Sequence, residues 1–374
     1  MRRSAWTTLL SAALLSTGCG DPIVVLGDAP GFMRVVAGIP DSLGVRIDSL
    51  ALRTRLTDPA ALAFEPDRAL LYVVDRGSVR QQGGITQNVA RIMSVDSRSR
   101  LRLLVDGGGC SSGTCLHAAT QMVPAPDGTF LIADPIGHRV MRFDPLTNAL
   151  TAVAGTGANI FTPDGAPAAS ASLRAPYGVA IGRDGRIYIS EQGASRVRYI
   201  DETGALRTLA GTGVAGYAGD GGPAAEALLS LPSGLAVDAD AVYIADAGNH
   251  TVRTVGLGDG TITTLAGTGG QGFSGDGGPA VLAQLFVPIG LVLSIDGTTL
   301  FIADRENHRI RVVNLVSRSI QTFAGSGSPQ FSGSRGPAGD TSLRWPTGLA
   351  IAERGFLYIA DTGHFVIWRA ALTL

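Results

Sequence analysis

The sequence predicts an all-β protein, a six-bladed β-propeller made of four-stranded blades. Three observations lead to this fold: a repeat of 55 to 59 residues, four short strand patterns in each repeat, and a last repeat whose missing strand stands near the N-terminus. Repeats of this length are typical of propellers and solenoids. A radially repeated unit of four strands is typical of a propeller blade.

The repeat is marked by an acidic residue that closes a run similar to Tyr-Ile-Ala-Asp. The marker recurs six times, which predicts six blades, at Asp75, Asp134, Glu191, Asp246, Asp304 and Asp361. The order of strands in a blade places these carboxylates at the ends of the second strands, around the axis. They lie toward the top face, which carries the loops between second and third strands and the crossovers between blades.

The unit that begins at Leu231 shows the four strands. Runs rich in Thr, Val, Ile and Tyr at 235–237, 242–245, 250–255 and 261–266 are separated by turn residues. Small residues such as Gly234 recur in the first strand. This pattern fits an inner strand that is crowded around the propeller axis.

The last unit, 345–374, contains only three strand patterns. The string MRVVAG at 33–38 matches the fourth strand of the complete units. We therefore expect the N-terminal strand to complete the last blade, which leaves no open seam in the ring. Residues 33–374 are predicted to form the propeller.

Composition excludes several other classes of protein. The chain has 374 residues, of which 45% are hydrophobic and only 16% charged, with 51 Gly. This content of apolar residues excludes a disordered chain, and the many glycines exclude a coiled coil. A net charge of −1 gives no basic footprint, so no nucleic-acid partner is expected.

Residues 1–18 fit an export signal, because a basic start precedes an apolar run at 5–15 that is too short to span a bilayer. The string that ends at Cys19 resembles the lipobox of bacterial lipoproteins. This resemblance implies a lipid anchor at Cys19, a tether at 19–32, and a location in the bacterial cell envelope, periplasmic or at the outer surface. An ordinary signal peptide that contains a cysteine is the alternative.

Short strings after the acidic markers point to a family. They are Asn249-His250, Asn307-His308, His138 and His364. These strings resemble those of NHL-repeat propellers, which are named after Asn-His-Leu. The loops 216–228 and 272–285 are similar to those of many exported bacterial NHL proteins and of the teneurin propeller. The resemblance covers 33–374 and implies the fold, whereas one propeller fold hosts many activities.

Long loops gather on the predicted top face: the crossover 267–285, the loop 76–88 and the crossover 106–118. Insertions on one face commonly mark a binding face. In an exported chain Cys110 and Cys115 predict a local disulfide. A metal site with His117 and free thiols are the alternatives.

The six acidic markers allow two interpretations. As candidate top-face binding residues they would hold a polar ligand or a cation such as calcium at the channel mouth. Alternatively, each accepts backbone N–H bonds in its own turn and pairs with the histidine four residues on, or with Arg253 or Arg311 on the third strand. Every blade repeats the feature, which favours the structural interpretation. No cofactor is predicted.

Other polar residues repeat in the same way. His138, His250, His308 and His364 are taken as one repeat position, which favours turn packing, because catalysis needs one positioned acid or base. Asp164, Asp220 and Asp276 stand in Asp-Gly strings that lack the ligand pattern of a calcium-binding EF-hand, so we interpret them as turns.

These features favour an exported, membrane-anchored, non-catalytic binding or scaffold propeller that recognises a protein or a glycan through its top-face loops. The alternative is a metal-dependent propeller enzyme, because the NHL family includes a lyase of α-hydroxyglycine peptides and other six-bladed propellers are lactonases. Residues outside the repeat pattern that could serve such a site are few: His117, Tyr177 and Glu306. A purely structural envelope protein is a third interpretation.

Overall fold

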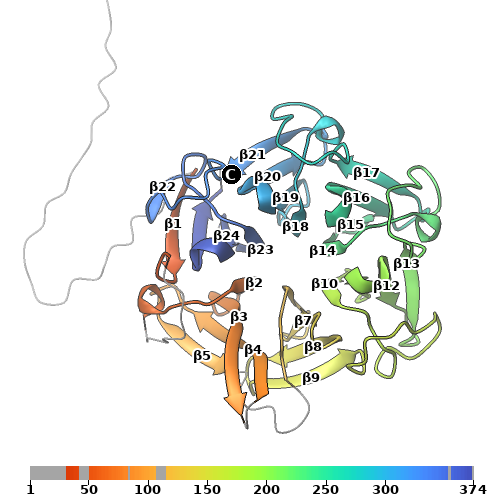
Figure 1. The fold of residues 1–374 in the computed structure, drawn as a ribbon, viewed down its shortest axis with the longest axis horizontal. Coiled ribbons are helices and arrows are strands. Elements are labelled where there is room, and N and C mark those ends of the chain that lie inside the picture. Colours follow the sequence, from red (N-terminus) through yellow and green to blue (C-terminus); the bar gives the residue numbers. More distant parts are fainter. Residues whose placement is uncertain (1–30, 42–49, 83–84, 107–114, 353–354, 373–374) are drawn as a thin grey trace, which may run out of the picture.

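The computed structural model describes residues 31–41, 50–82, 85–106, 115–352 and 355–372. Within them, six antiparallel sheets stand around a central axis, so the predicted six-bladed propeller is confirmed (Figure 1). The predicted signal segment 1–18, Cys19 with most of the tether, and Cys110 lie outside the described residues. Each helix in the described part is a single 3₁₀ turn of three residues, and none could cross a membrane.

The first three blades each pair four strands in chain order, from the axis outward. Blade 1 consists of β2 (Pro59–Glu65), β3 (Leu70–Gln82), β4 (Ile85–Val95) and β5 (Leu101–Val105). Blade 2 consists of β6 (Gln121–Pro124), β7 (Phe130–Asp134), β8 (Arg139–Asp144) and β9 (Ala149–Ala154). Blade 3 consists of β10 (Pro176–Ile181), β11 (Ile187–Glu191), β12 (Arg196–Ile200) and β13 (Leu206–Ala210).

The next two blades follow the same order, and the sixth differs in its outer strands. Blade 4 consists of β14 (Pro232–Val237), β15 (Ala241–Asp246), β16 (Thr251–Gly256) and β17 (Ile262–Ala266). Blade 5 consists of β18 (Pro288–Leu293), β19 (Thr299–Asp304), β20 (Arg309–Asn314) and β21 (Ile320–Ala324). Blade 6 consists of β23 (Pro346–Ala352), β24 (Phe356–Asp361), β25 (Val366–Ala371), β1 (Phe32–Ala37) and β22 (Arg335–Pro337).

The N-terminal strand closes the ring, as the sequence predicts. β1 pairs antiparallel with β25, with Met33 opposite Ala370 and Val35 opposite Trp368. On its other edge β1 pairs with β22. Because β25 runs from the top face to the opposite face, which we call the bottom face, β1 starts at the bottom and runs upward. Met33 is fully buried, so the strand contributes to the core as well as to the sheet.

The hydrophobic core lies between neighbouring blades. Each apolar cluster joins residues of two adjacent blades, and one of them joins Phe301 of β19 to Leu349 and Trp368 of blade 6. The inner strands approach so closely that a Cβ at Gly290 would lie 2.0 Å from the carbonyl oxygen of Thr347 in the next blade. This spacing confirms the expected need for small residues around the axis.

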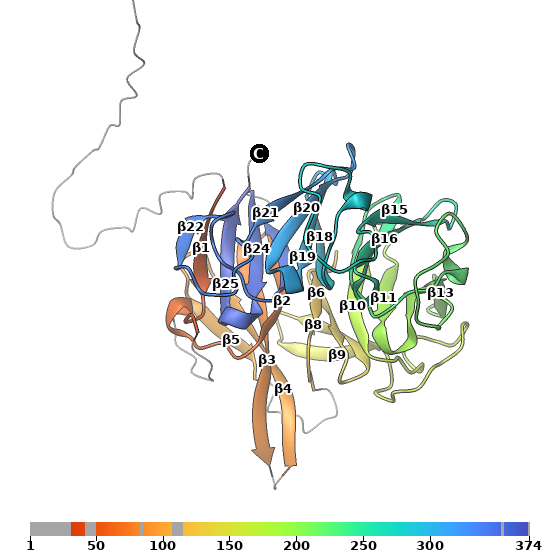
Figure 2. The same ribbon diagram turned by 45° about the horizontal axis from the view of Figure 1, so that its top comes forward.

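The segment 76–88, expected as a loop, belongs instead to a long hairpin. β3 and β4 continue past Asp75, with Ser78 opposite Val89 and Gln82 opposite Ile85. Figure 2 shows this two-stranded ribbon projecting beyond the body of the ring. The sequence signal was weak because polar residues fill both strands of the projecting part. The residues of this segment are mostly polar, so the sequence does not show the alternation of apolar and polar residues that identifies a half-buried strand.

Crossovers of the GDGGPA type extend along the outer edges of the blades that they enter. Gly221 donates to the carbonyl of Ile262 on β17 and Gly222 accepts from its amide, at 2.8 and 3.1 Å. Gly277 and Gly278 do the same for Ile320 on β21. In blade 6 the equivalent segment is β22. These crossovers therefore cover strand edges that would otherwise expose unpaired backbone groups.

Candidate functional site

The six acidic markers are completely buried. Five of them end the second strand of their blade, whereas Asp75 lies within the longer strand β3. Each accepts backbone N–H bonds from the segment that leads into the first strand of that blade, at 2.7–2.9 Å. The donors are Thr57, Asp58, His117, Ala118, Arg174, Ser230, Phe286 and Arg344. Each carboxylate thus fixes the crossover to its blade.

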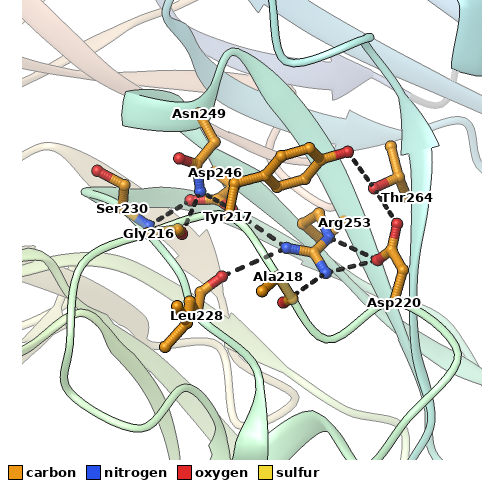
Figure 3. A network of polar contacts seen from close by, with 10 residues as sticks. All are labelled: Gly216, Tyr217, Ala218, Asp220, Leu228, Ser230, Asp246, Asn249, Arg253 and Thr264. Atoms are coloured by element: carbon orange, nitrogen blue, oxygen red, sulfur yellow. Dashed lines mark hydrogen bonds and ion pairs between the residues drawn. The ribbon is translucent and has the colours of Figure 1, made fainter.

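In blade 4 the carboxylate belongs to a larger network centred on Arg253 (Figure 3). The guanidinium of Arg253 lies 3.5 Å from Asp246 and 2.5 Å from Asp220 of the preceding crossover. Asp220 also accepts a hydrogen bond from Thr264, and the ring of Tyr217 covers the guanidinium at 5.2 Å. The Arg253 side chain is fully buried, whereas Asp220 is 44% exposed. The arginine therefore joins an inner and an outer carboxylate.

Blades 3 and 5 repeat this network. Arg198 joins Glu191 to Asp164, and Arg311 joins Asp304 to Asp276. The interpretation of the Asp-Gly strings as turns is therefore incomplete, because their aspartates also form ion pairs with the third strand. In blade 6 the arginine is replaced by Trp368, the crossover aspartate by Ser334, and Phe331 packs against the Trp368 ring at 6.0 Å. In blade 6, both members of the ion pair are therefore replaced, and a contact between two aromatic rings stands in its place.

Burial and hydrogen bonding set the ionisation of these groups. Burial raises the pKa of Asp246 and of Asp304 to about 6, against the opposing effects of the hydrogen bonds from Asn249 and Asn307 and of the nearby arginines. Burial also raises the pKa of Glu191. Carboxylates with raised pKa values often mark functional sites, but ion-pair networks inside a fold produce the same effect.

Blade 2 has no arginine at the equivalent place on β8, where Met141 stands. His117 takes over the contact, with its Nδ1 3.3 Å from Asp134. Burial opposes ionisation of Asp134, but the hydrogen bonds from His117 and from backbone amides lower its pKa. His117, which does not belong to the repeated histidines, is thus the local partner of the acidic marker Asp134.

Three of the repeated histidines join neighbouring blades. Nδ1 of His138, His250 and His308 accepts the backbone N–H of Ala175, Val287 and Trp345 at 3.2–3.3 Å. Each of these histidines has a positive φ of 52–56° and ends the turn after the second strand. Burial lowers their pKa values, which favours the neutral ring that the hydrogen bond requires.

His364 does not belong to this set, which corrects the expectation from sequence. It stands three residues after Asp361, at the position of Asn249 and Asn307, whereas Phe365 takes the histidine position with φ 60°. Its Nδ1 lies 2.7 Å from Asp361 and its Nε2 2.9 Å from the carbonyl oxygen of Pro329. Burial opposes a charge on His364, but the hydrogen bond and the charge of Asp361 raise its pKa.

The structure does not bring the six acidic markers together into one site. Each carboxylate has its partners within its own blade and the crossover that enters it. In the part of the chain that the structure describes, no group of three or more His, Cys, Asp or Glu residues could hold a metal ion. Tyr177 lies near the axis, where its carbonyl accepts from Thr120, and Glu306 pairs with Arg305. The predicted Cys110–Cys115 disulfide remains a prediction.

A groove on the top face, between blades 5 and 6, offers an accessible site. It has a volume of about 670 Å³, within the range of roughly 300–1,000 Å³ that is usual for ligand sites. We call it the Trp345 groove. It is lined by Asp41, His308, Pro329, Gln330, Phe331, Arg344, Trp345 and Phe365.

The Trp345 groove combines aromatic surface with charge. The guanidinium groups of Arg344 and Arg305 lie 4.7 and 5.5 Å from the centre of the Trp345 ring. Arg344 forms no ion pair with any residue that the structure describes. Asp41 and Gln330 supply exposed polar groups on the same groove. Trp and Arg side chains in such places carry much of the affinity of protein interfaces.

A signal for this groove is present in the repeat pattern. Trp345 has φ 52° and occupies the position held by Ala175, Leu231 and Val287 in other blades. A tryptophan at a partly exposed position where other blades place aliphatic residues stands out once the repeats are aligned.

Comparison with known protein families identifies NHL repeats in the chain. Residues 44–216 match the model of the teneurin NHL domain, and residues 229–254 match that of the NHL repeat. NHL repeat-containing protein 2 of Bos taurus is 27% identical over 66% of this chain and 38% of its own length, so the chain spans well under half of that relative.

Solved structures share the fold. An auxiliary nutrient binding protein from Bacteroides thetaiotaomicron superposes with a TM-score of 0.65 at 16% identity, covering 90% of this chain and 75% of that one. A gluconolactonase from Xanthomonas campestris superposes with a TM-score of 0.54 at 12% identity, covering 85% and 87%. At these identities the likeness concerns the fold alone.

Proposed function

The chain belongs to the NHL-repeat β-propellers, and on this premise we propose that it is a binding protein that recognises a protein or glycan partner through the Trp345 groove. The observation that carries the proposal is the groove itself, in which Trp345, Phe365 and the guanidinium of Arg344 are accessible together. The similarity in fold to a nutrient binding protein supports a binding role without identifying the ligand. The buried acidic markers serve the scaffold that holds this groove.

Substitution of Trp345 should weaken partner recognition without unfolding the propeller. Its link to His308 is made by the backbone, so Trp345→Ala keeps that bond and removes only the ring. Immobilised protein would be screened on arrays of glycans and of envelope proteins. We expect Trp345→Ala and Phe365→Ala to weaken any specific interaction by at least about tenfold.

Leu146→Ala provides the control, because Leu146 is 75% exposed and lies on the bottom face. Partners whose affinity is unchanged in both groove variants would contradict the proposed site. Thermal melting of each variant separates lost binding from lost structure.

We also propose that the protein is exported and held to a bacterial membrane by lipid at Cys19. The chain enters β1 from the bottom face, so a tether at 19–32 leaves the Trp345 groove on the opposite face. Labelling with radioactive palmitate in a bacterial host should mark the full chain and not Cys19→Ala, whereas Cys115→Ala should retain the label. Label that persists in Cys19→Ala would refute the anchor.

A further inference from the structure

A second cavity lies on the axis at the bottom face, away from the Trp345 groove. We call it the axial pit. Its volume is about 400 Å³, and the inner strands of all six blades line it. Leu62, Leu235, Leu291 and Leu349 are nearly fully buried at its base, and Phe64 and Ile295 stand toward its mouth. No charged side chain is among its lining residues.

The base of the pit is sealed by one polar side chain. Gln121 of β6 reaches across the axis to blade 4, where its Nε2 donates to the carbonyl of Leu235 at 2.7 Å. Its Oε1 accepts the amides of Leu235 and of Val179 at 3.0 and 3.2 Å. These three bonds use the oxygen and one of the two N–H groups of the amide. The other side chains that line the pit are apolar, and an apolar lining favours a ligand with an apolar body.

The mouth of the pit is acidic. Asp67, Asp238 and Asp296 each directly follow a lining residue, namely Pro66, Val237 and Ile295. None of these three carboxylates forms an ion pair with an arginine of the described segments.

Two further acids of this face, Asp127 and Asp184, are paired with Arg142 and Arg186. Of the other basic residues that the structure describes in the loops between first and second strands, Arg68 pairs with Glu65, and Arg183 stands beside Asp184. The balance of charge around the pit is therefore negative on the side of blades 1, 4 and 5.

From this arrangement we infer that the axial pit binds a small amphipathic cation, with an apolar body in the pit and an ammonium group at the acidic mouth. Burial of the apolar body is favourable because it removes apolar surface from water. A charge inside the pit would be costly, since no partner is present there, so the charged group must stay at the mouth. Asp238 and Asp296 also accept hydrogen bonds within their own hairpins, which leave their negative charge in place. The charge of the three carboxylates then selects a positive group and repels an anion of the same shape.

The test uses two probes of equal chain length, decyltrimethylammonium and decanoate, both below their micelle concentrations. Calorimetry with the folded protein should show binding of the cation and at least about tenfold weaker binding of the anion at low salt. The triple variant Asp67→Asn, Asp238→Asn, Asp296→Asn keeps the side-chain shapes and one acceptor oxygen in each turn. It should bind the two probes about equally.

A second variant fills the cavity. Leu293→Trp at the pit wall should abolish binding of both probes, and Ile136→Ala, at a position that is 51% exposed on the other face, should leave both unchanged. Equal affinity of the wild type for cation and anion, or binding that survives in Leu293→Trp with its fold intact, would overturn the assignment. Because the two sites lie on opposite faces, failure here does not affect the proposal for the Trp345 groove.

Discussion

A chain that begins at Gly38 should lose the cooperative unfolding transition that a chain beginning at Gly31 shows. The shorter chain lacks β1, and with it the buried side chains of Met33, Val35 and Val36. Full burial of such a side chain contributes about 1.5–3 kcal/mol, so the loss is comparable to the whole stability of a typical domain, about 5–15 kcal/mol. It also exposes the edge of β25, which invites aggregation.

The measurement is thermal unfolding followed by circular dichroism and calorimetry, with light scattering to detect aggregation. The chain from Gly31 with Met33→Ala should unfold at a temperature between those of the two chains, because the substitution lowers the free energy of unfolding by about 2–5 kcal/mol. If the chain from Gly38 unfolded at the same temperature as the chain from Gly31, closure by β1 would not contribute to stability.

Arg253→Met should destabilise the propeller by about 3–5 kcal/mol at pH 8, because it leaves Asp246 buried without its cationic partner. Burial already raises the pKa of Asp246 to about 6. Without Arg253 the pKa rises further, so the native state takes up a proton that the unfolded state releases. The penalty is therefore full above the folded-state pKa and fades as the pH falls toward 4.

Urea unfolding at pH 8 and pH 5 measures both effects. The double variant Arg253→Met, Asp246→Asn should recover much of the loss, since no buried charge remains. Arg142→Met breaks the more exposed pair with Asp127 and should cost less than about 1 kcal/mol. An Arg253→Met variant that is no less stable than Arg142→Met at pH 8 would show that the buried pair has no structural role.

The fold was predictable because each blade repeats the same local information. The acidic markers, the turn residues and the displaced fourth strand at 33–38 all lie within short, alignable strings. The partner of Asp220 was not predictable in this way, because Arg253 stands 33 residues away on another element. A structure is needed to show that a crossover and a third strand meet.

Two features of the sites escaped prediction for other reasons. His364 resembles the other histidines in sequence, but it is one residue closer to its acidic marker. This difference places its ring against Asp361 instead of against the next blade. The axial pit could not be distinguished from core, because its residues follow the same apolar pattern as any inner strand. Trp345 departs from the aliphatic residues at its repeat position, and a comparison of the repeats at that position would have pointed to it.

The placement of β1 has a mechanical consequence. β25 holds one edge of the strand and β22 the other, by hydrogen bonds that run across the strand axis. Tension applied to the chain before Phe32, directed away from the bottom face, loads these bonds in shear, so they resist together instead of opening one after another. Drag on the top face of a tethered molecule would be transmitted to this same strand. The ring would then yield by sliding of β1 out of blade 6, while the other five blades kept their pairing.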